Sequence, residues 1–138
     1  DLTLIEEGFL SPEKVIVVGV RNWDIEEYNY IRRKNIRVFT MQQIMQYGVN
    51  DVAQTIMESV RQWPSFYLSI DIDVLDPAFA PGTGYREPGG LSTRELLFFV
   101  QRLKMLSNYG MADLVEINPT KDVDGITIKT GAKIIMEL

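Results

Sequence analysis

The sequence contains neither cysteine nor histidine. The lack of cysteine excludes disulfides, thiolate zinc sites and cysteine nucleophiles. The lack of histidine means that this chain cannot complete a mechanism that needs an imidazole, either as a base or as the commonest ligand of a transition metal. Any mechanism that needs an imidazole must therefore take it from outside these 138 residues.

Long apolar runs and clustered cations are also missing. No run of about 18 apolar residues could span a bilayer, and no charged-then-apolar leader directs secretion. The 14 Lys and Arg are scattered among 19 Asp and Glu, for a net charge of −5, whereas nucleic-acid binding needs cations grouped on one face. The basic run at 32–34 fits the end of a helix instead. We expect a soluble cytoplasmic protein that binds neither nucleic acid nor membranes.

The composition that remains is that of an ordinary globular protein, with 46% hydrophobic and 24% charged residues. A chain of this length can bury a core of its own, so we expect one domain over residues 1–138. The first residue is Asp1 rather than methionine. We therefore expect that a preceding segment has been removed.

Short apolar runs alternate with helical patterns. The runs are β-branched or aromatic and bounded by turn residues, which predicts strands; they lie at 15–18, 36–39, 66–70 and 111–117. Capping side chains predict the helix starts; they are Asn22 or Asp24, Thr40 with Gln43, Asn50 or Asp51, and Ser92 with Glu95. A last helix is predicted over 125–138. This alternation predicts an α/β fold, a three-layer α-β-α arrangement with a mainly parallel sheet.

Two carboxylates follow the third predicted strand. Asp71 and Asp73 are two residues apart, so extended backbone would put both on one side, within reach of one cation or a metal pair. In a second interpretation one aspartate caps the next element and the other is solvated. In a third, an apolar strand ending in Asp-x-Asp begins a haloacid-dehalogenase-type phosphatase, whose first carboxylate attacks a phosphoryl group. A loop of about twenty residues rich in Pro and Gly comes next. Loops of that length are usually functional or disordered, and because strong elements flank this one we interpret it as functional.

The residues around this loop carry a family resemblance. The run SIDIDVLDPAFAPGTG from Ser69, followed by EPGGLS from Glu87, closely resembles the C-terminal signature of the ureohydrolase family of arginases and agmatinases. VVGVR at 17–21 and VEINP at 115–119 continue the match in order, which a phosphatase would not predict. The segment 87–95 looks more like agmatinases than arginases. The chain thus resembles the C-terminal half of an agmatinase.

This resemblance implies a site and a reaction. It casts Asp71 as a carboxylate bridging two manganese ions, Asp73 as a ligand of one of them, and Glu116 as the partner of the substrate guanidinium. It implies a manganese-dependent hydrolase of polyamine biosynthesis, a homo-oligomer that converts agmatine to putrescine and urea. It assigns no general acid or base to this chain.

The family's two histidine ligands and two further aspartates belong to an earlier half of the sequence and have no counterpart here. The alternative is therefore a noncatalytic fragment, or a metal-binding module for assembly or regulation. We expect the isolated chain to be inactive, and an exposed strand edge to make it self-associate.

Further expectations concern the loop and its surroundings. Asp76 should accept backbone N–H bonds that hold the turn before Pro77, and Gly82 and Gly84 should allow backbone conformations closed to other residues. Arg21 is expected to be structural or an inter-subunit ion-pair partner.

Tyr85 and Arg86 stand where the family commonly shows Thr-Pro, and that threonine lies close to the substrate. Arg86 either favours a substrate that bears a carboxylate or points to solvent.

Overall fold

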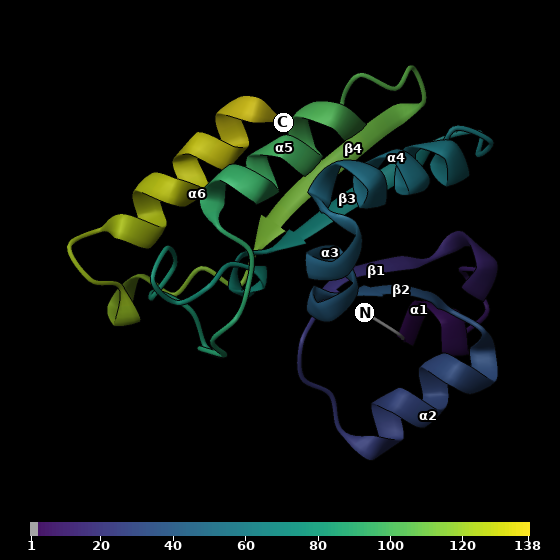
Figure 1. Cartoon of the computed structure of the whole chain (residues 1–138), viewed down its shortest axis with the longest axis horizontal. Coiled ribbons are helices and arrows are strands. Elements are labelled where there is room, and N and C mark those ends of the chain that lie inside the picture. Colours follow the sequence, from purple (N-terminus) through teal and green to yellow (C-terminus); the bar gives the residue numbers. More distant parts are fainter. Residues whose placement is uncertain (1–2) are drawn as a thin grey trace.

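The computed structural model describes residues 3–138, in which strands alternate with helices (Figure 1). The helices are α1 (Thr3–Glu6), α2 (Ile25–Lys34), α3 (Met41–Tyr47), α4 (Val49–Val60), α5 (Thr93–Leu103) and α6 (Ile126–Glu137), and the strands are β1 (Ile16–Val20), β2 (Arg37–Thr40), β3 (Phe66–Asp71) and β4 (Tyr109–Val115). Short 3₁₀ turns lie at η1 (Pro12–Lys14), η2 (Ile72–Val74) and η3 (Pro119–Lys121).

Most of the predicted helix starts are confirmed. Asp24, Thr40 and Ser92 each cap a helix and form a reciprocal capping box with the residue three positions on. The start of α4 differs from the prediction, because its N-cap is Gly48 rather than Asn50 or Asp51. Gly48 adopts a φ of 86° and also ends α3, so one glycine serves both helices.

The strands are parallel, as predicted, but they pair as two separate ladders. β1 pairs with β2 and β3 pairs with β4, each as a two-stranded sheet. The fourth strand lies at Tyr109–Val115, two residues before its predicted position. Its end at Val115 pairs with Asp71, which is the last residue of β3.

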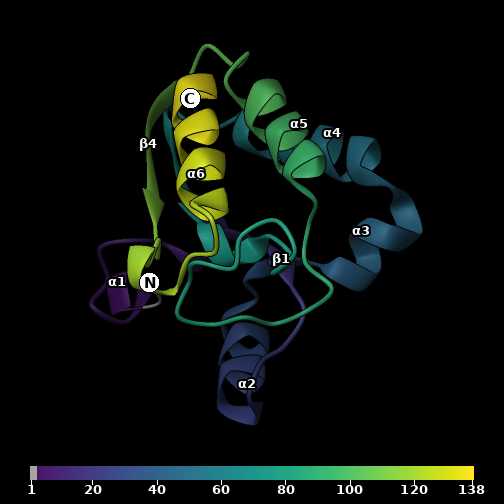
Figure 2. The same cartoon turned by 90° about the vertical axis from the view of Figure 1, so that its left-hand side faces the viewer.

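Helices cover the two ladders unequally. α2 lies on one face of β1–β2 and α3 packs against the other, so the three-layer arrangement is complete there (Figure 1). Around β3–β4, helices α4, α5 and α6 all lie on the same side (Figure 2). The opposite face carries Tyr67 and Met111, which are 55% and 66% exposed. Within residues 3–138, the second layer of β3–β4 is therefore not present.

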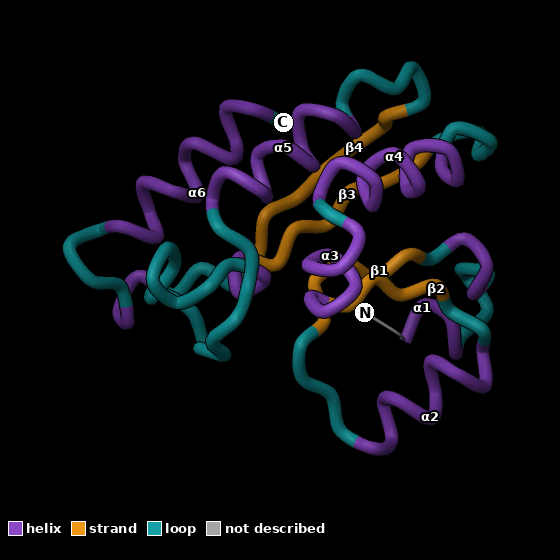
Figure 3. Tube along the Cα trace, viewed as in Figure 1, coloured by secondary structure: helices purple, strands orange, loops and turns teal. Residues whose placement is uncertain are grey.

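The main core joins these parts and sets the position of the loops. Side chains from α3, α4, α5 and α6 pack against Phe66 and Ile70 of β3, while Val18 and Phe39 of the first ladder pack against the same cluster. The loops gather where β3 and β4 end (Figure 3). None of the helices within residues 3–138 has the length and hydropathy of a membrane-spanning segment.

Candidate metal and substrate site

The paired aspartates lie at the carboxyl end of β3, the position where ligands bind in parallel α/β sheets. Asp71 ends the strand and caps the 3₁₀ turn η2, because its Oδ1 accepts the N–H of Asp73 at 3.2 Å. Ile72, between them, is fully buried and anchors the turn in the core. The expected extended backbone is therefore replaced by a tight turn. The turn still brings the two carboxyl groups close enough for each to act on the pKa of the other.

These carboxylates are hard to ionise. Asp71 is exposed as a residue, yet neighbouring atoms shield its carboxyl group from part of the solvent, and this desolvation raises its pKa together with the charge of Asp73. Desolvation also raises the pKa of Asp73, and the nearby charge of Glu116 adds to the rise. A carboxylate that is both desolvated and crowded by like charges favours a bound cation.

Glu116 follows β4 and reaches the same end of the sheet. Its backbone has a φ of +64°, which is uncommon for a residue with a side chain. Such a conformation costs roughly 1 kcal/mol or more. A Cβ added at Gly84 would lie 3.8 Å from Oε2 of Glu116, so the carboxylate faces the loop after β3. The strained backbone thus presents Glu116 beside the aspartates.

The base of that loop is fastened by backbone bonds and by Asp76. The N–H of Asp76 donates to the carbonyl of Leu91, and the N–H of Leu91 to that of Val74, each at 2.9 Å. The carboxylate of Asp76 accepts the N–H of Ala78 at 2.9 Å and that of Gly89 at 2.7 Å. These bonds to N–H groups lower the pKa of Asp76. The expectation that Asp76 holds the turn is confirmed.

The top of the loop is fastened to the start of α6. The N–H of Gly82 donates to the buried hydroxyl of Thr127 at 2.7 Å, and the carbonyl of Gly82 accepts the N–H of Asn118 at the same distance. A Cβ at Gly82 would lie 2.8 Å from atoms of both Asp122 and Thr127. Neither Gly82 nor Gly84 has a positive φ. The predicted reason for these glycines is therefore wrong: Gly82 is needed for space.

Thr83 is a residue that sequence reasoning missed. It is 1% exposed, forms an isolated bridge with Ile117, and its hydroxyl has no hydrogen-bond partner within the described residues. A buried polar atom without a partner is rare in native proteins and calls for an explanation. Its bridge partner Ile117 follows Glu116 directly, so this buried hydroxyl lies beneath the segment that carries Glu116. The only signal in the sequence was its place between two glycines.

Arg21 connects the first ladder to the site. Its Nη2 donates to the carbonyl of Asp73 at 2.5 Å and its Nε to the carbonyl of Glu87 at 2.9 Å. Gly19 permits this approach, because it has a φ of +86° and a Cβ there would lie 2.5 Å from Val74. Arg21 therefore has a structural role, which was one of the two expected for it.

The residues that depart from the family pattern also make defined contacts. The Tyr85 hydroxyl accepts the side-chain N–H of Asn22 at 3.0 Å. Arg86 is exposed, yet its guanidinium donates to the carbonyl of Lys121, and Nζ of Lys121 donates to the carbonyl of Gly84 at 3.4 Å. Arg86 therefore lies exposed at the edge of the loop, with its guanidinium bound to the backbone of η3.

The donor set tests whether manganese fits here. Asp71 and Asp73 offer carboxylate oxygens, which suit manganese. Desolvation raises the pKa values of both, and a bound cation would favour their ionised forms. Within the part of the chain that the structure describes, no group of three or more His, Cys, Asp or Glu side chains could hold a metal ion. The aspartates fit as part of a metal site that needs further ligands.

Comparisons with known proteins show the family of the chain. The model of the arginase family matches residues 3–138. Over 136 residues, the chain is 38% identical to a guanidinopropionase of Pseudomonas aeruginosa, covering 97% of this chain and 42% of that protein. Over the same number of residues it is 39% identical to a proclavaminate amidinohydrolase of Streptomyces clavuligerus, covering 97% and 43%.

A solved structure shows the same fold. The native arginase of Bacillus caldovelox superposes with a TM-score of 0.90 at 32% identity, over 94% of this chain and 44% of that one. The chain thus spans less than half the length of each of these relatives.

Proposed function

The chain belongs to the arginase family, and from that premise we propose that the whole protein hydrolyses the guanidinium C–N bond of a small compound to urea and an amine. In this proposal residues 1–138 form the C-terminal part of one arginase-like α/β domain. They supply part of the active site, and the remaining ligands come from the part of the relatives' length that this chain does not cover.

The observation that carries the proposal is the grouping of three carboxylates where β3 and β4 end. The N–H of Asp73 donates to the carboxylate of Asp71, and Glu116 lies close enough to Asp73 to raise its pKa. The charge of Arg21 lowers the pKa values of both aspartates, but desolvation outweighs it. A further cation bound among the three carboxylates would therefore stabilise their ionised forms. A metal pair and a guanidinium group are both cations that such a cluster would stabilise.

Each residue then has a distinct role. Asp71 and Asp73 would hold manganese, which when bound lowers the pKa of water enough to supply hydroxide near neutral pH. Glu116 would accept two parallel N–H bonds from the planar guanidinium and orient its carbon. Arg21, through the Asp73 carbonyl, keeps the aspartates in place.

Agmatine is the substrate that the sequence predicts, from the segment 87–95. The relatives described above are named guanidinopropionase, proclavaminate amidinohydrolase and arginase, so agmatine stays a prediction. The test is urea release by the full-length, manganese-loaded protein, with agmatine, arginine and 3-guanidinopropionate as substrates. Urea from at least one of them is the expected result. No urea from any of them would contradict the proposed reaction.

One observation favours a second candidate for the isolated chain. Within residues 3–138 no third side chain joins Asp71 and Asp73 in a group that could hold a metal ion, so the 138 residues alone are proposed to be a noncatalytic module that binds metal weakly. Restoring the missing length decides between the two. Turnover that appears only in the longer protein supports the enzyme, and turnover that never appears supports the module.

Self-association is also proposed, as in the sequence-based expectation of a homo-oligomer. The uncovered face of β3–β4 supports it, because Tyr67 and Met111 there are largely exposed. Light scattering of the isolated chain should show a species larger than a monomer, and Met111→Lys should reduce its size. A monodisperse monomer would contradict this part of the proposal.

A further inference from the structure

Gly84 lies between groups of opposite charge. Oε2 of Glu116 is 3.8 Å from the position that a Cβ on Gly84 would take, and Nζ of Lys121 is 3.4 Å from the Gly84 carbonyl oxygen. These two points on one residue are about 3 Å apart, so the ammonium and the carboxylate lie within roughly 10 Å of each other. They are more than 4.0 Å apart, since they form no ion pair. A short molecule could therefore contact both.

The cationic side of this gap holds a second positive charge. The Arg86 guanidinium donates to the backbone carbonyl of Lys121, which brings the two side chains onto the same rim. Both are exposed, and both stand next to the segment that carries Glu116. We call Arg86 and Lys121 the cationic rim.

No carboxylate neutralises the cationic rim within the described residues. The single ion pair found among residues 3–138 joins Lys133 and Glu137, far along α6. Asp122 follows Lys121 directly, but its carboxylate accepts the N–H groups of Val123, Thr127 and Ile128 at the start of α6. The site therefore has an unmatched anionic side and an unmatched cationic side, separated by Gly84.

We propose that the cationic rim binds the carboxylate of the substrate, so that the protein selects a guanidino acid over agmatine. This rests on the proposed hydrolysis and changes its substrate class. In a guanidino acid the guanidinium can pair with Glu116 while a chain of about two to four methylene groups carries the carboxylate to Lys121 and Arg86. Agmatine places an ammonium group there instead, next to two like charges.

The test compares two substrates of equal chain length. Agmatine and 5-guanidinopentanoate both carry four methylene groups after the guanidino nitrogen and differ in an ammonium against a carboxylate. Urea release by the full-length, manganese-loaded protein gives kcat/KM for each. The quantity of interest is the ratio of the two values, because a ratio within one variant does not depend on the fraction of active protein.

The expected ratio favours the acid in the wild type. Lys121→Met should lower kcat/KM for the acid by about tenfold, the loss of one exposed charge-assisted contact, without lowering it for agmatine. Arg86→Gln should shift the ratio in the same direction. Lys129→Met is the matched control, since Nζ of Lys129 also bonds a nearby backbone carbonyl, that of Asp124, but on α6 away from Gly84. It should leave the ratio unchanged.

The outcomes separate the two proposals. Urea formation with the same ratio in wild type, Lys121→Met and Arg86→Gln would overturn the cationic rim and leave the hydrolase standing. A wild-type preference for agmatine would do the same. No urea from any guanidino compound would overturn the hydrolase, and the rim with it.

Discussion

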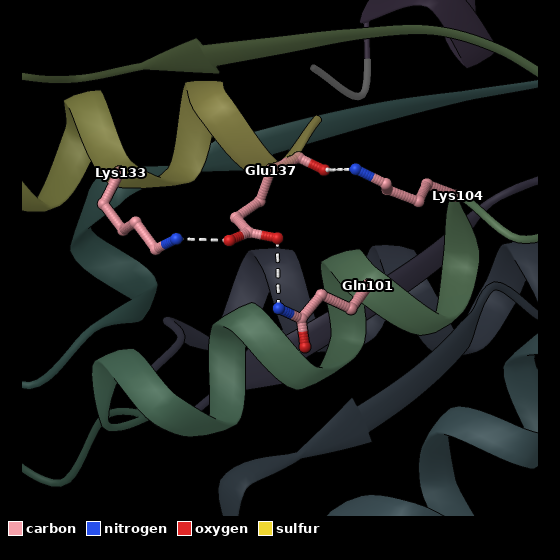
Figure 4. A network of polar contacts seen from close by, with 4 residues as sticks. All are labelled: Gln101, Lys104, Lys133 and Glu137. Atoms are coloured by element: carbon pink, nitrogen blue, oxygen red, sulfur yellow. Dashed lines mark hydrogen bonds and ion pairs between the residues drawn. The ribbon is translucent and has the colours of Figure 1, made fainter.

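Carboxyl pKa values shift in opposite directions at the two ends of the β3–β4 unit. Where α5 and α6 finish, Glu137 accepts hydrogen bonds from Lys133 and from Gln101 at 3.0 Å, and Lys104 donates to its carbonyl at 2.5 Å (Figure 4). Lys133 and Gln101 together lower the pKa of Glu137. Where β3 and β4 end, by contrast, desolvation raises the pKa values of Asp71 and Asp73.

This difference separates stability from function. At the Glu137 end, side chains of this chain bind the charged carboxylate. The contacts from Gln101 and Lys104 join α5 to α6. The Asp71 end gathers carboxylates, adds a strained backbone at Glu116, and leaves the hydroxyl of Thr83 without a partner within the described residues. Such unfavourable features persist at sites where a ligand compensates for them. The following variants test that division, beginning with the largest expected effect.

Asp71→Asn in the full-length protein should cause the largest loss of activity. Asparagine keeps the oxygen that caps η2 but lacks the charge that holds manganese. Urea release should fall by about 1000-fold or more, while the unfolding midpoint of the metal-free protein should stay the same or rise. Glu58→Gln, an exposed carboxylate on α4, is the control and should keep full activity. Retained turnover in Asp71→Asn would contradict the assignment.

Glu116→Gln should have the next largest effect. Glutamine cannot form a charge-assisted pair with a guanidinium, so kcat/KM should fall by about 100-fold while the manganese content is kept. Glu116→Gly distinguishes the role of the carboxylate from the strain of the backbone. It should lose the same activity, but its free energy of unfolding should rise by about 1 kcal/mol, because glycine adopts a positive φ without strain. Unchanged kcat/KM in Glu116→Gln would exclude it as the guanidinium partner.

Gly82→Ala tests the loop that joins the site to α6. The new Cβ would clash with Asp122 and Thr127, so the free energy of unfolding should fall by about 1–3 kcal/mol in urea denaturation. Gly84→Ala is matched to it, since its Cβ would meet Glu116 at an ordinary contact distance. It should leave stability within about 0.5 kcal/mol. Equal loss in both variants would show that backbone freedom, rather than space, selects these glycines.

The smallest expected effect is a loss of stability in acid that comes from Asp122, at the start of α6. Partial burial opposes ionisation of Asp122, but the N–H groups of Thr127, Ile128 and Val123 outweigh it and lower the pKa from 3.8 to about 2. The folded pKa lies below the unfolded one, so the carboxylate stabilises the fold above about pH 4 and this contribution is lost as the pH falls toward 2. Urea midpoints at pH 5 and pH 3 should differ less in Asp122→Asn than in the wild type. Asp124→Asn, two residues on, should behave as the wild type.

Local features of this fold were predictable from the sequence because their partners lie a few residues apart. The capping boxes at Thr40 and Ser92 and the turn held by Asp76 depend on side chains that reach their own neighbourhood. The apolar run at 66–70 also placed Asp71 and Asp73 correctly where a strand ends. The family resemblance predicted their roles as metal ligands, and those roles remain to be tested.

Features that depend on distant segments were not predictable in the same way. Nothing near Gly82 in the sequence indicates that Asp122 and Thr127 pack against it. The division into two ladders depends on which strands pair, and the sequence of a single strand does not determine its neighbours in the sheet. The rim contact between Arg86 and Lys121 joins residues 35 positions apart. For Arg86 the sequence left two interpretations open, and only the folded chain shows its partner.

The central claim is that the unmatched carboxylates at the end of β3 are there to hold metal. The most direct measurement is the manganese content of the full-length protein after dialysis, compared between wild type, Asp71→Asn and Glu58→Gln. The account predicts about two manganese ions per wild-type chain, the same in Glu58→Gln, and a loss of bound metal in Asp71→Asn. Equal manganese in all three proteins would contradict it.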